Sequence, residues 1–240
     1  MYCLVKMHKK NKKAGTHVGV ILSFVIFVTF LIFMMVFIQP PTKEKETKTS
    51  ALNTLKVNLE KETSEEITTL LVHNQVSTAN CVYVDESSLN LGSTNSTVKD
   101  ADEGIIESKR EGGNIYFDNT GGNNFFKVIY SEEDFTSIEL SDTIDCEPAV
   151  INAHTNKKEI LESKIVETIN FYETNYSDLK QTMNLAFDED FSIQFEYSNK
   201  TIIGQESTGR KTNIYSSKFQ ILYLDKNADL KIGNFIISIW

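Results

Sequence analysis

Histidine, cysteine and proline are all scarce in this chain of 240 residues, with four, three and three copies. His73 and His154 have no histidine, cysteine or acidic partner at metal-ligand spacing, such as the H-x-x-H pattern, so the sequence predicts no metal site. The chain also lacks the G-x-S-x-G motif of serine hydrolases and a glycine-rich phosphate loop ending in Lys-Ser/Thr. We therefore expect no catalytic set and no cofactor from recognised patterns.

A stripe of basic residues, as in nucleic-acid readers, is also missing. The chain has 24 basic and 33 acidic residues, and residues 1–41 hold five lysines and no acid. The remainder has 19 basic against 33 acidic residues, a net charge of −14. An acidic surface repels a phosphate backbone, so we expect no nucleic-acid partner.

One long apolar run stands out against this polar composition. Residues 18–38 carry no charge over 21 positions. As a helix rising about 1.5 Å per residue, the run would be roughly 31 Å long, which matches a bilayer core of about 30 Å. Its apolar residues cover every direction around the axis, whereas a helix on a soluble core has one apolar face. The run predicts a transmembrane helix with the lipid bilayer as its partner.

The flanks of this run bear on cleavage and orientation. Residues 1–17 form a basic leader, as in a signal peptide, but a cleavable apolar region is typically about 7 to 15 residues long. Retention is therefore favoured over cleavage. Five lysines precede the run, and three follow it, interleaved with Glu44 and Glu46. This asymmetry predicts a single-pass membrane protein with a cytoplasmic N-terminus and an exterior C-terminal region.

The exterior location gives meaning to two cysteines and three sequons. Cys81 and Cys146 lie beyond the run and predict one disulfide, with two separate buried thiols as the alternative. Cys3 precedes the run. The Asn-x-Ser/Thr triplets are compatible with glycosylation, and they begin at Asn95, Asn175 and Asn199.

Residues 39–66 form a predicted stalk that is partly helical. Pro40 and Pro41 should end the membrane helix. Leu52, Leu55 and Leu59 then recur at steps of three and four, which predicts a second helix over residues 50–63 with an apolar edge that docks on the following domain.

Residues 67–155 have the pattern of a β-rich exterior region. Runs rich in β-branched and aromatic residues begin near residues 67, 81, 114 and 124, and polar or glycine-bearing segments separate them. This spacing predicts an antiparallel sheet. The stretch 91–113 has few large apolar residues and is predicted to be an exposed loop.

Residues 156–240 predict a helix followed by antiparallel strands, so that the fold class is α+β. One continuous helix is expected to bury a face that consists of Leu161, Ile165, Ile169, Tyr172, Tyr176, Leu179 and Met183. Two-residue alternation from Phe191 to Tyr197 predicts a strand, and two more strands should flank a turn at 225–229. The apolar C-terminus, ending at Trp240, should be packed.

Two clusters of acidic residues and one polar segment are candidate sites. Asp225, Asn227 and Asp229 alternate as in a calcium loop, but the glycine and the glutamate that such a loop needs are absent, so a hairpin turn is favoured. Residues 188–190 are three consecutive acids, which can act as acid and base in pairs but more often form a solvated connection. The segment 207–211 is interpreted as a loop between strands.

The leader "KKNKKAG", followed directly by the apolar helix, resembles the class III signal of archaeal type IV pilin-like proteins. The resemblance covers about 30 residues, and the later order of helix and antiparallel strands is loosely similar. It implies removal of the leader near Ala14 or Gly15. The apolar helix would remain as a membrane anchor or filament core.

Two classes of function remain open. The first is a non-catalytic cell-surface protein, a structural or binding module that meets protein partners or self-assembles and that could be a pilin-like subunit. The second is a membrane-anchored exterior enzyme such as a hydrolase. The enzyme would need a closed pocket lined by several ionisable residues, whereas a flat or convex exterior favours binding or assembly.

Overall fold

The computed structural model describes residues 14–75, 79–87, 89, 91, 95–141, 143, 145–186, 188–205 and 213–240. The first thirteen residues of the predicted leader and the predicted loop at 207–211 lie outside these ranges. Contacts divide the chain into two units, Met1–Ser50 and Ala51–Trp240.

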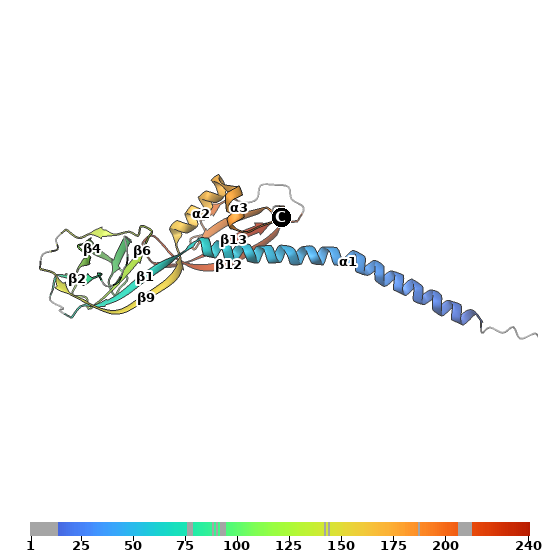
Figure 1. The fold of residues 1–240 in the computed structure, drawn as a ribbon, viewed down its shortest axis with the longest axis horizontal. Coiled ribbons are helices and arrows are strands. Elements are labelled where there is room, and N and C mark those ends of the chain that lie inside the picture. The colour runs from blue at the N-terminus through green and yellow to red at the C-terminus, as the bar shows by residue number, and fades with distance from the viewer. Residues whose placement is uncertain are drawn as a thin grey trace, which may run out of the picture. The chain divides into compact units, whose positions relative to one another are not determined.

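Helix α1 runs from Ala14 to Glu62 without interruption (Figure 1). The predicted end of the membrane helix at Pro40 and Pro41 is therefore wrong, and so is a separate helix at 50–63. Each proline removes one backbone donor, but its fixed φ of about −65° is itself helical. The backbone can therefore stay helical across the pair. The predicted apolar edge is confirmed, because Leu55 and Leu59 are completely buried.

The first sheet follows α1 directly. Its strands are β1 (Ser64–His73), β2 (Cys81–Asp85), β3 (Asn95–Lys99), β4 (Ile105–Glu111), β5 (Asn114–Asp118), β6 (Phe125–Ser131), β7 (Ile138–Glu139), β8 (Glu147–Pro148) and β9 (Val150–Ile160). The order is β8-β2-β5-β4-β3-β6-β1-β9, with β7 beside β4. All pairs are antiparallel except β2–β8 and β4–β7. Strand β9 pairs with β1 along its whole length.

The predicted exposed loop at 91–113 is wrong, because it contains β3 and β4. These strands have few large apolar residues, but β3 lies between β4 and β6 in the interior of the sheet, where its backbone groups are paired. Val98 is completely buried in the same cluster as Val128 and Phe117. Position in the sheet, and not residue composition, thus makes this segment a strand.

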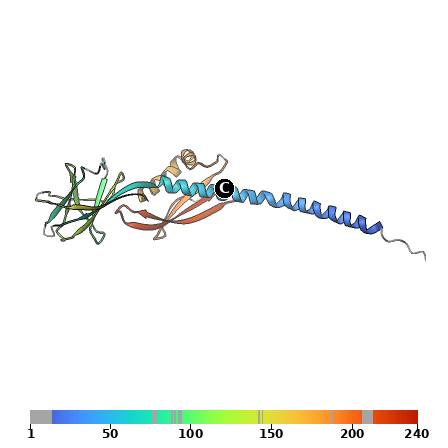
Figure 2. The same ribbon diagram turned by 60° about the horizontal axis from the view of Figure 1, so that its bottom comes forward.

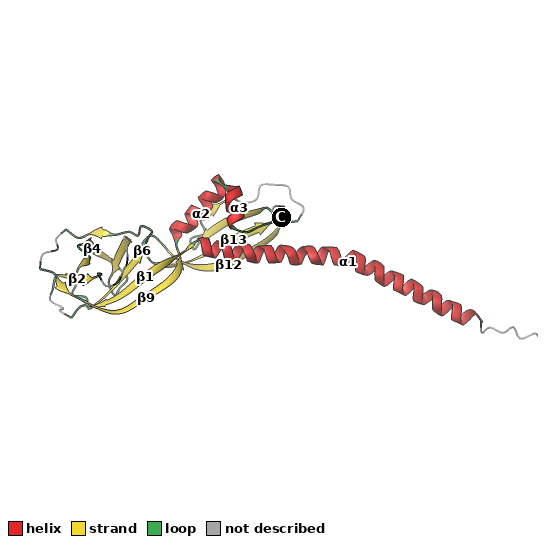
Figure 3. Ribbon diagram, in the orientation of Figure 1, coloured by secondary structure: helices red, strands yellow, loops and turns green. Residues whose placement is uncertain are grey.

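The rest of the chain forms helices packed on a second, four-stranded antiparallel sheet (Figure 3). Its elements are α2 (Glu162–Thr174), α3 (Tyr176–Thr182), β10 (Phe191–Tyr197), β11 (Ile202–Gly204), β12 (Tyr215–Leu224) and β13 (Leu230–Ile239). The sheet order is β11-β10-β13-β12. The fold is therefore α+β, as predicted.

The predicted continuous helix over 161–183 is two helices. Asn175 has φ −134° and ψ 49°, which ends α2 before α3 begins. The break is associated with tertiary contacts of Tyr176, whose hydroxyl accepts the N–H of Phe191 at 3.0 Å and donates to Asp190 at 3.0 Å. The predicted face still lies in the core through Ile165, Ile169, Leu179 and Met183.

One core joins α1, α2 and α3 to the same face of the second sheet (Figure 2). Phe191, Ile193 and Phe195 alternate along β10 toward this core, as predicted. Gly233 on β13 is required by packing, since a Cβ there would lie 2.2 Å from Cζ of Phe195. The predicted packing of the C-terminus is confirmed, because Ile239 is completely buried.

Candidate functional site

The N-terminal part of α1 is a candidate membrane-spanning helix. From His17 to Met35 its mean hydropathy is 2.8, and none of this window is buried. Phe24, Val25, Ile26 and Phe27 are 50% to 66% exposed. Consecutive residues point about 100° apart, so these four apolar side chains surround the axis. It is the one such helix among the described residues, and a signal sequence near an N-terminus has the same length and composition.

The predicted disulfide pair is brought together. Cys81 and Cys146 have Cα atoms 4.5 Å apart and sulfurs at bonding distance. Cys81 begins β2, and Cys146 immediately precedes β8, which pairs in parallel with β2. The pair therefore holds the short β8 against the edge of the first sheet.

The residues considered for calcium form a hairpin turn between β12 and β13. Oδ1 of Asp225 accepts the backbone N–H groups of Asn227 and Asp229, both at 2.9 Å. These bonds are typical of Asp in turns and occupy the oxygen that a cation would use. Among the described residues, no group of three or more histidine, cysteine or acidic side chains could hold a metal.

A buried lysine connects this turn to the first sheet. Lys99 on β3 is completely buried, and its Nζ lies 2.5 Å from Oδ1 of Asp229 and 3.1 Å from the carbonyl oxygen of Ala228. Its hydrogen bond, followed by that of Lys231, lowers the pKa of the Asp229 carboxyl below the ordinary value of 3.8. The sequence predicted neither the strand nor the buried charge, and no spacing pattern marks Lys99.

Apolar contacts and a backbone bond complete this junction of the two sheets. Ala228 in the turn is buried against Ile67 and Ile129 of the first sheet. The N–H of Thr136 donates to the carbonyl oxygen of Lys226 at 2.7 Å. The turn is thus a docking element within the unit Ala51–Trp240.

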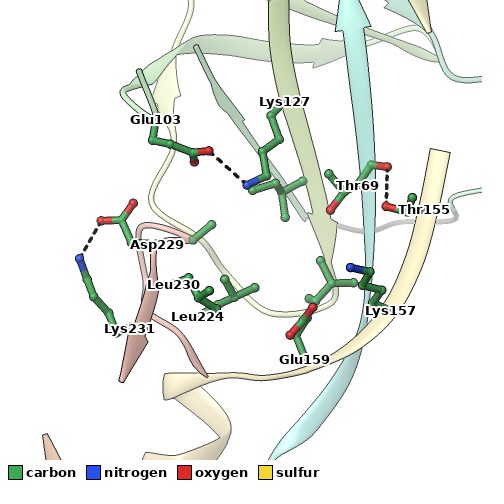
Figure 4. A pocket seen from close by; sticks show the side chains of 13 residues that line it. Thr69, Glu103, Lys127, Thr155, Lys157, Glu159, Leu224, Asp229, Leu230 and Lys231 are labelled. Carbon is green, nitrogen blue, oxygen red and sulfur yellow. Dashed lines mark hydrogen bonds and ion pairs between the residues drawn. The ribbon is translucent and has the colours of Figure 1, made fainter. Parts of the chain in front are cut away.

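A groove of about 610 Å³ lies beside the junction (Figure 4). Ile67, Thr69 and Ile129 of the first sheet line it, with Thr155 of β9 and residues of the β12–β13 hairpin. Its charged lining residues are balanced in number and consist of Lys127, Lys157 and Lys231 with Glu103, Glu159 and Asp229. The rim is exposed, since Leu230 is 59% exposed.

Most of the charges around the groove are engaged with one another. Glu103 lies 3.5 Å from Nζ of Lys127, and Asp229 lies 3.1 Å from Nζ of Lys231. Thr155 donates to the backbone oxygen of Thr69 at 3.5 Å. Such a surface can form mixed polar and apolar contacts with a ligand. Its paired ions are already neutralised by neighbours.

A second buried charge lies inside the first sheet region. Glu86 is 4% exposed, and its two oxygens lie 2.6 Å from Nε of Arg110 and 2.6 Å from the hydroxyl of Tyr130. Burial, followed by the hydrogen bond to Glu86, raises the pKa of Tyr130. The network satisfies a carboxylate that would otherwise be costly to bury.

Glu189 and Asp190 of the acidic segment 188–190 differ in their surroundings. Glu189 is buried, while Oδ1 of Asp190 lies 3.4 Å from Nζ of Lys180 and accepts the hydroxyl of Tyr176. The backbone of Asp190 pairs with that of Trp240 through two hydrogen bonds. This segment joins α3 to the end of the second sheet.

The three sequons lie in different surroundings. Asn95 is the first residue of β3, Asn175 lies between α2 and α3, and Asn199 lies in the turn between β10 and β11. All three side chains belong to exposed residues. Their local hydrogen bonds differ.

Comparison with known proteins finds no family model, no curated protein and no solved structure that matches this chain.

Proposed function

We propose that this chain is a single-pass membrane-anchored protein with a cytoplasmic N-terminus and an exterior body, and that the body is a structural or binding module, as in a pilin-like subunit. One observation carries the proposal. Helix α1 is apolar on all sides over His17–Met35, and its last turns place Leu55 and Leu59 in the core of the body. The same helix therefore supplies both the anchor and a core element.

Two further features support an exterior body. The pair Cys81–Cys146 is at bonding distance, and disulfides persist in oxidising compartments outside the cytosol. The lysine-rich leader precedes the apolar run, which favours a cytoplasmic N-terminus. The acidic excess beyond the run supports solubility.

The groove supports binding in preference to catalysis. A general acid or base must exchange a proton with substrate, whereas Asp229 is held as a carboxylate by Lys99 and Lys231. Glu103 likewise faces Lys127. An exposed groove with neutralised charges is a contact surface for a partner.

Strand β9 supports assembly with protein partners. It is the last strand in the order of the first sheet, and most of its eleven residues are exposed. Edge strands offer backbone donors and acceptors to an added strand. A register shift opposite Leu71 and Val72, together with Lys157 and Lys158, protects part of this edge from strand addition.

The anchor is tested by extracting membranes from cells that make the full chain. We expect the protein to resist alkaline carbonate and to require detergent. Ile26→Lys with Phe27→Lys should release it, because each lysine at a helix centre costs about 2.5 to 3.5 kcal/mol of insertion free energy. Leu71→Lys with Leu222→Lys replaces two exposed apolar residues of the body and should leave extraction unchanged. Equal extraction of both double variants would refute the anchor.

Orientation is tested with a membrane-impermeant maleimide on intact cells. Gln220→Cys places a thiol on an exposed position of β12 and should be labelled, while Cys3 should not. The reverse pattern would overturn the proposed topology. Mass spectrometry of the mature N-terminus separates a chain that begins at Met1 from one cut near Gly15 or after Ile38, and only the last outcome contradicts an anchor.

A further inference from the structure

We infer that Asn199 is a site of N-linked glycosylation and that the folded chain disfavours the other two sequons. The inference rests on the proposed exterior location of the body. Transfer joins the side-chain amide nitrogen of asparagine to the anomeric carbon of a lipid-pyrophosphate-linked oligosaccharide. The C–O bond to pyrophosphate breaks with its electron pair, and the amide proton passes to a base of the transferase. The amide nitrogen must therefore be accessible, with the Ser/Thr hydroxyl beside it.

Asn199 lies at the tip of a tight hairpin. The N–H of Lys200 donates to the carbonyl oxygen of Tyr197 at 2.9 Å, and the N–H of Tyr197 donates to that of Thr201 at 2.9 Å. Lys200 has φ 71°, the left-handed conformation that closes such loops. All residues from 198 to 201 are exposed. The tip therefore projects into solvent.

The sequon at Asn199 is held in a compact turn. Oδ1 of Asn199 accepts the backbone N–H of Thr201 at 2.9 Å. This bond brings the third residue of the triplet back toward the amide of the first, and it leaves the amide nitrogen facing away from its own backbone. Among the described residues, no acceptor is bonded to that nitrogen. The amide of Asn199 and the backbone of Thr201 thus lie together at an open surface.

At Asn95 the reacting nitrogen is occupied. Its Nδ2 donates to the carbonyl oxygen of Glu132 at 3.2 Å and to Oδ1 of Asp134 at 2.6 Å. Its backbone pairs with Ser131 of β6 in the first sheet. Transfer here would require both side-chain bonds to break and the strand end to open.

At Asn175 the last two residues of the triplet are held in α3. The carbonyl oxygen of Asn175 accepts the N–H groups of Asp178 and Leu179, both at 3.1 Å, so that Ser177 lies in the first turn of α3. Ser177 is therefore fixed in the helix, and the triplet does not form the compact turn seen at Asn199. Tyr176, the middle residue, is tied to Asp190 and Phe191.

The test uses the full chain purified from its own membranes, with glycopeptides mapped by mass spectrometry. We expect glycan on Asn199 and none on Asn95 or Asn175. Asn199→Asp keeps the oxygen that bonds Thr201 but removes the reacting nitrogen, so occupancy should fall to zero without loss of the turn. Thr201→Ala should also abolish occupancy, whereas Thr201→Ser and the matched control Asn175→Asp should retain it.

Two outcomes would overturn the inference. One is a bare Asn199 in protein whose body is labelled from outside by the maleimide, and this result leaves the proposed topology intact. The other is glycan on Asn95 or Asn175 while Asn199 is bare. A body that is unlabelled from outside and carries no glycan refutes the topology and the glycosylation site together.

Discussion

The salt bridge between Lys99 and Asp229 should be the strongest single polar contribution to the junction of the two sheets. The lysine is completely buried, and the Asp229 side chain is 33% exposed. Breaking a fully buried pair costs about 3 to 5 kcal/mol, because it leaves one charge without a partner. The partial exposure of Asp229 reduces this cost. The carboxylate of Glu103 reduces it further, because it lies 3.6 Å from Nζ of Lys99. We expect Asp229→Asn to lower the unfolding free energy by about 2 to 3 kcal/mol.

The partner substitution should cost less. Lys99→Met removes the buried charge itself and leaves Asp229 with Lys231 and solvent, so a loss of about 1 to 2 kcal/mol is expected. The double variant should have the same unfolding free energy as Lys99→Met alone. Once Lys99 is replaced, Asp229→Asn leaves no buried cation without a partner. The coupling energy should then equal the loss for Asp229→Asn in magnitude, about 2 to 3 kcal/mol.

The assay is chemical unfolding of the full chain in nonionic detergent. Trp240 is the only tryptophan and reports on the second sheet, while circular dichroism follows the whole body. Lys231→Met is the matched control, since it removes a 44% exposed lysine from the same carboxylate and should cost less than about 1 kcal/mol. Additive losses for Lys99→Met and Asp229→Asn, or equal losses for Asp229→Asn and Lys231→Met, would refute the reasoning.

Three further predictions concern the acid dependence of stability, the packing of the second sheet and the disulfide. Because the pKa of Asp229 is lowered from its ordinary value of 3.8, the carboxylate stabilises the fold at pH values above 3.8, and this stabilisation is lost as the pH falls through the folded pKa. The unfolding free energy should therefore fall less steeply with acid in Asp229→Asn than in the parent. Gly233→Ala should destabilise by about 1 to 3 kcal/mol or more, since its Cβ would overlap Phe195, and unchanged unfolding would contradict this packing. Replacing Cys81 and Cys146 by serine should cost about 4 kcal/mol for a bond spanning 65 residues, as measured against the oxidised parent, and should match the parent after reduction.

Elements with strong periodicity could be predicted from the sequence. The apolar run in α1 needs no tertiary information, because its composition alone exceeds what a soluble helix requires. The alternation of Phe191, Ile193 and Phe195 identified β10, and the turn at Asp225 followed from residues that bond their own backbone. In each case the local signal and the tertiary environment favour the same conformation.

Elements that depend on position in the sheet could not be predicted. Strand β3 contains one fully buried valine, Val98, and a buried lysine, so its composition resembles a loop. The helix break at Asn175 has no glycine or proline to mark it and accompanies contacts of Tyr176 with β10. Pro40 and Pro41 predicted an end to the helix that α1 does not have, because the fixed φ of proline is itself compatible with helical backbone.

The junction around Lys99 shows the same limit for a candidate site. Lysine at this position has no partner within its own strand, and Asp229 lies 130 positions away. Sequence alone identified Asp229 as part of a turn. Only the folded structure shows that Asp229 in this turn also neutralises the buried Lys99.

The central place of β13 in the second sheet constrains how the body is made. This strand is the last in the chain, yet it lies between β10 and β12. The first sheet has its described strands once residue 160 has been synthesised, whereas the second must wait for β13. Leu55 and Leu59 lack the β13 part of their core, Phe235, Ile237 and Ile239, until then. A nascent chain therefore carries an incomplete hydrophobic layer until β13 has emerged, and chaperones that shield such layers should bind it at that stage.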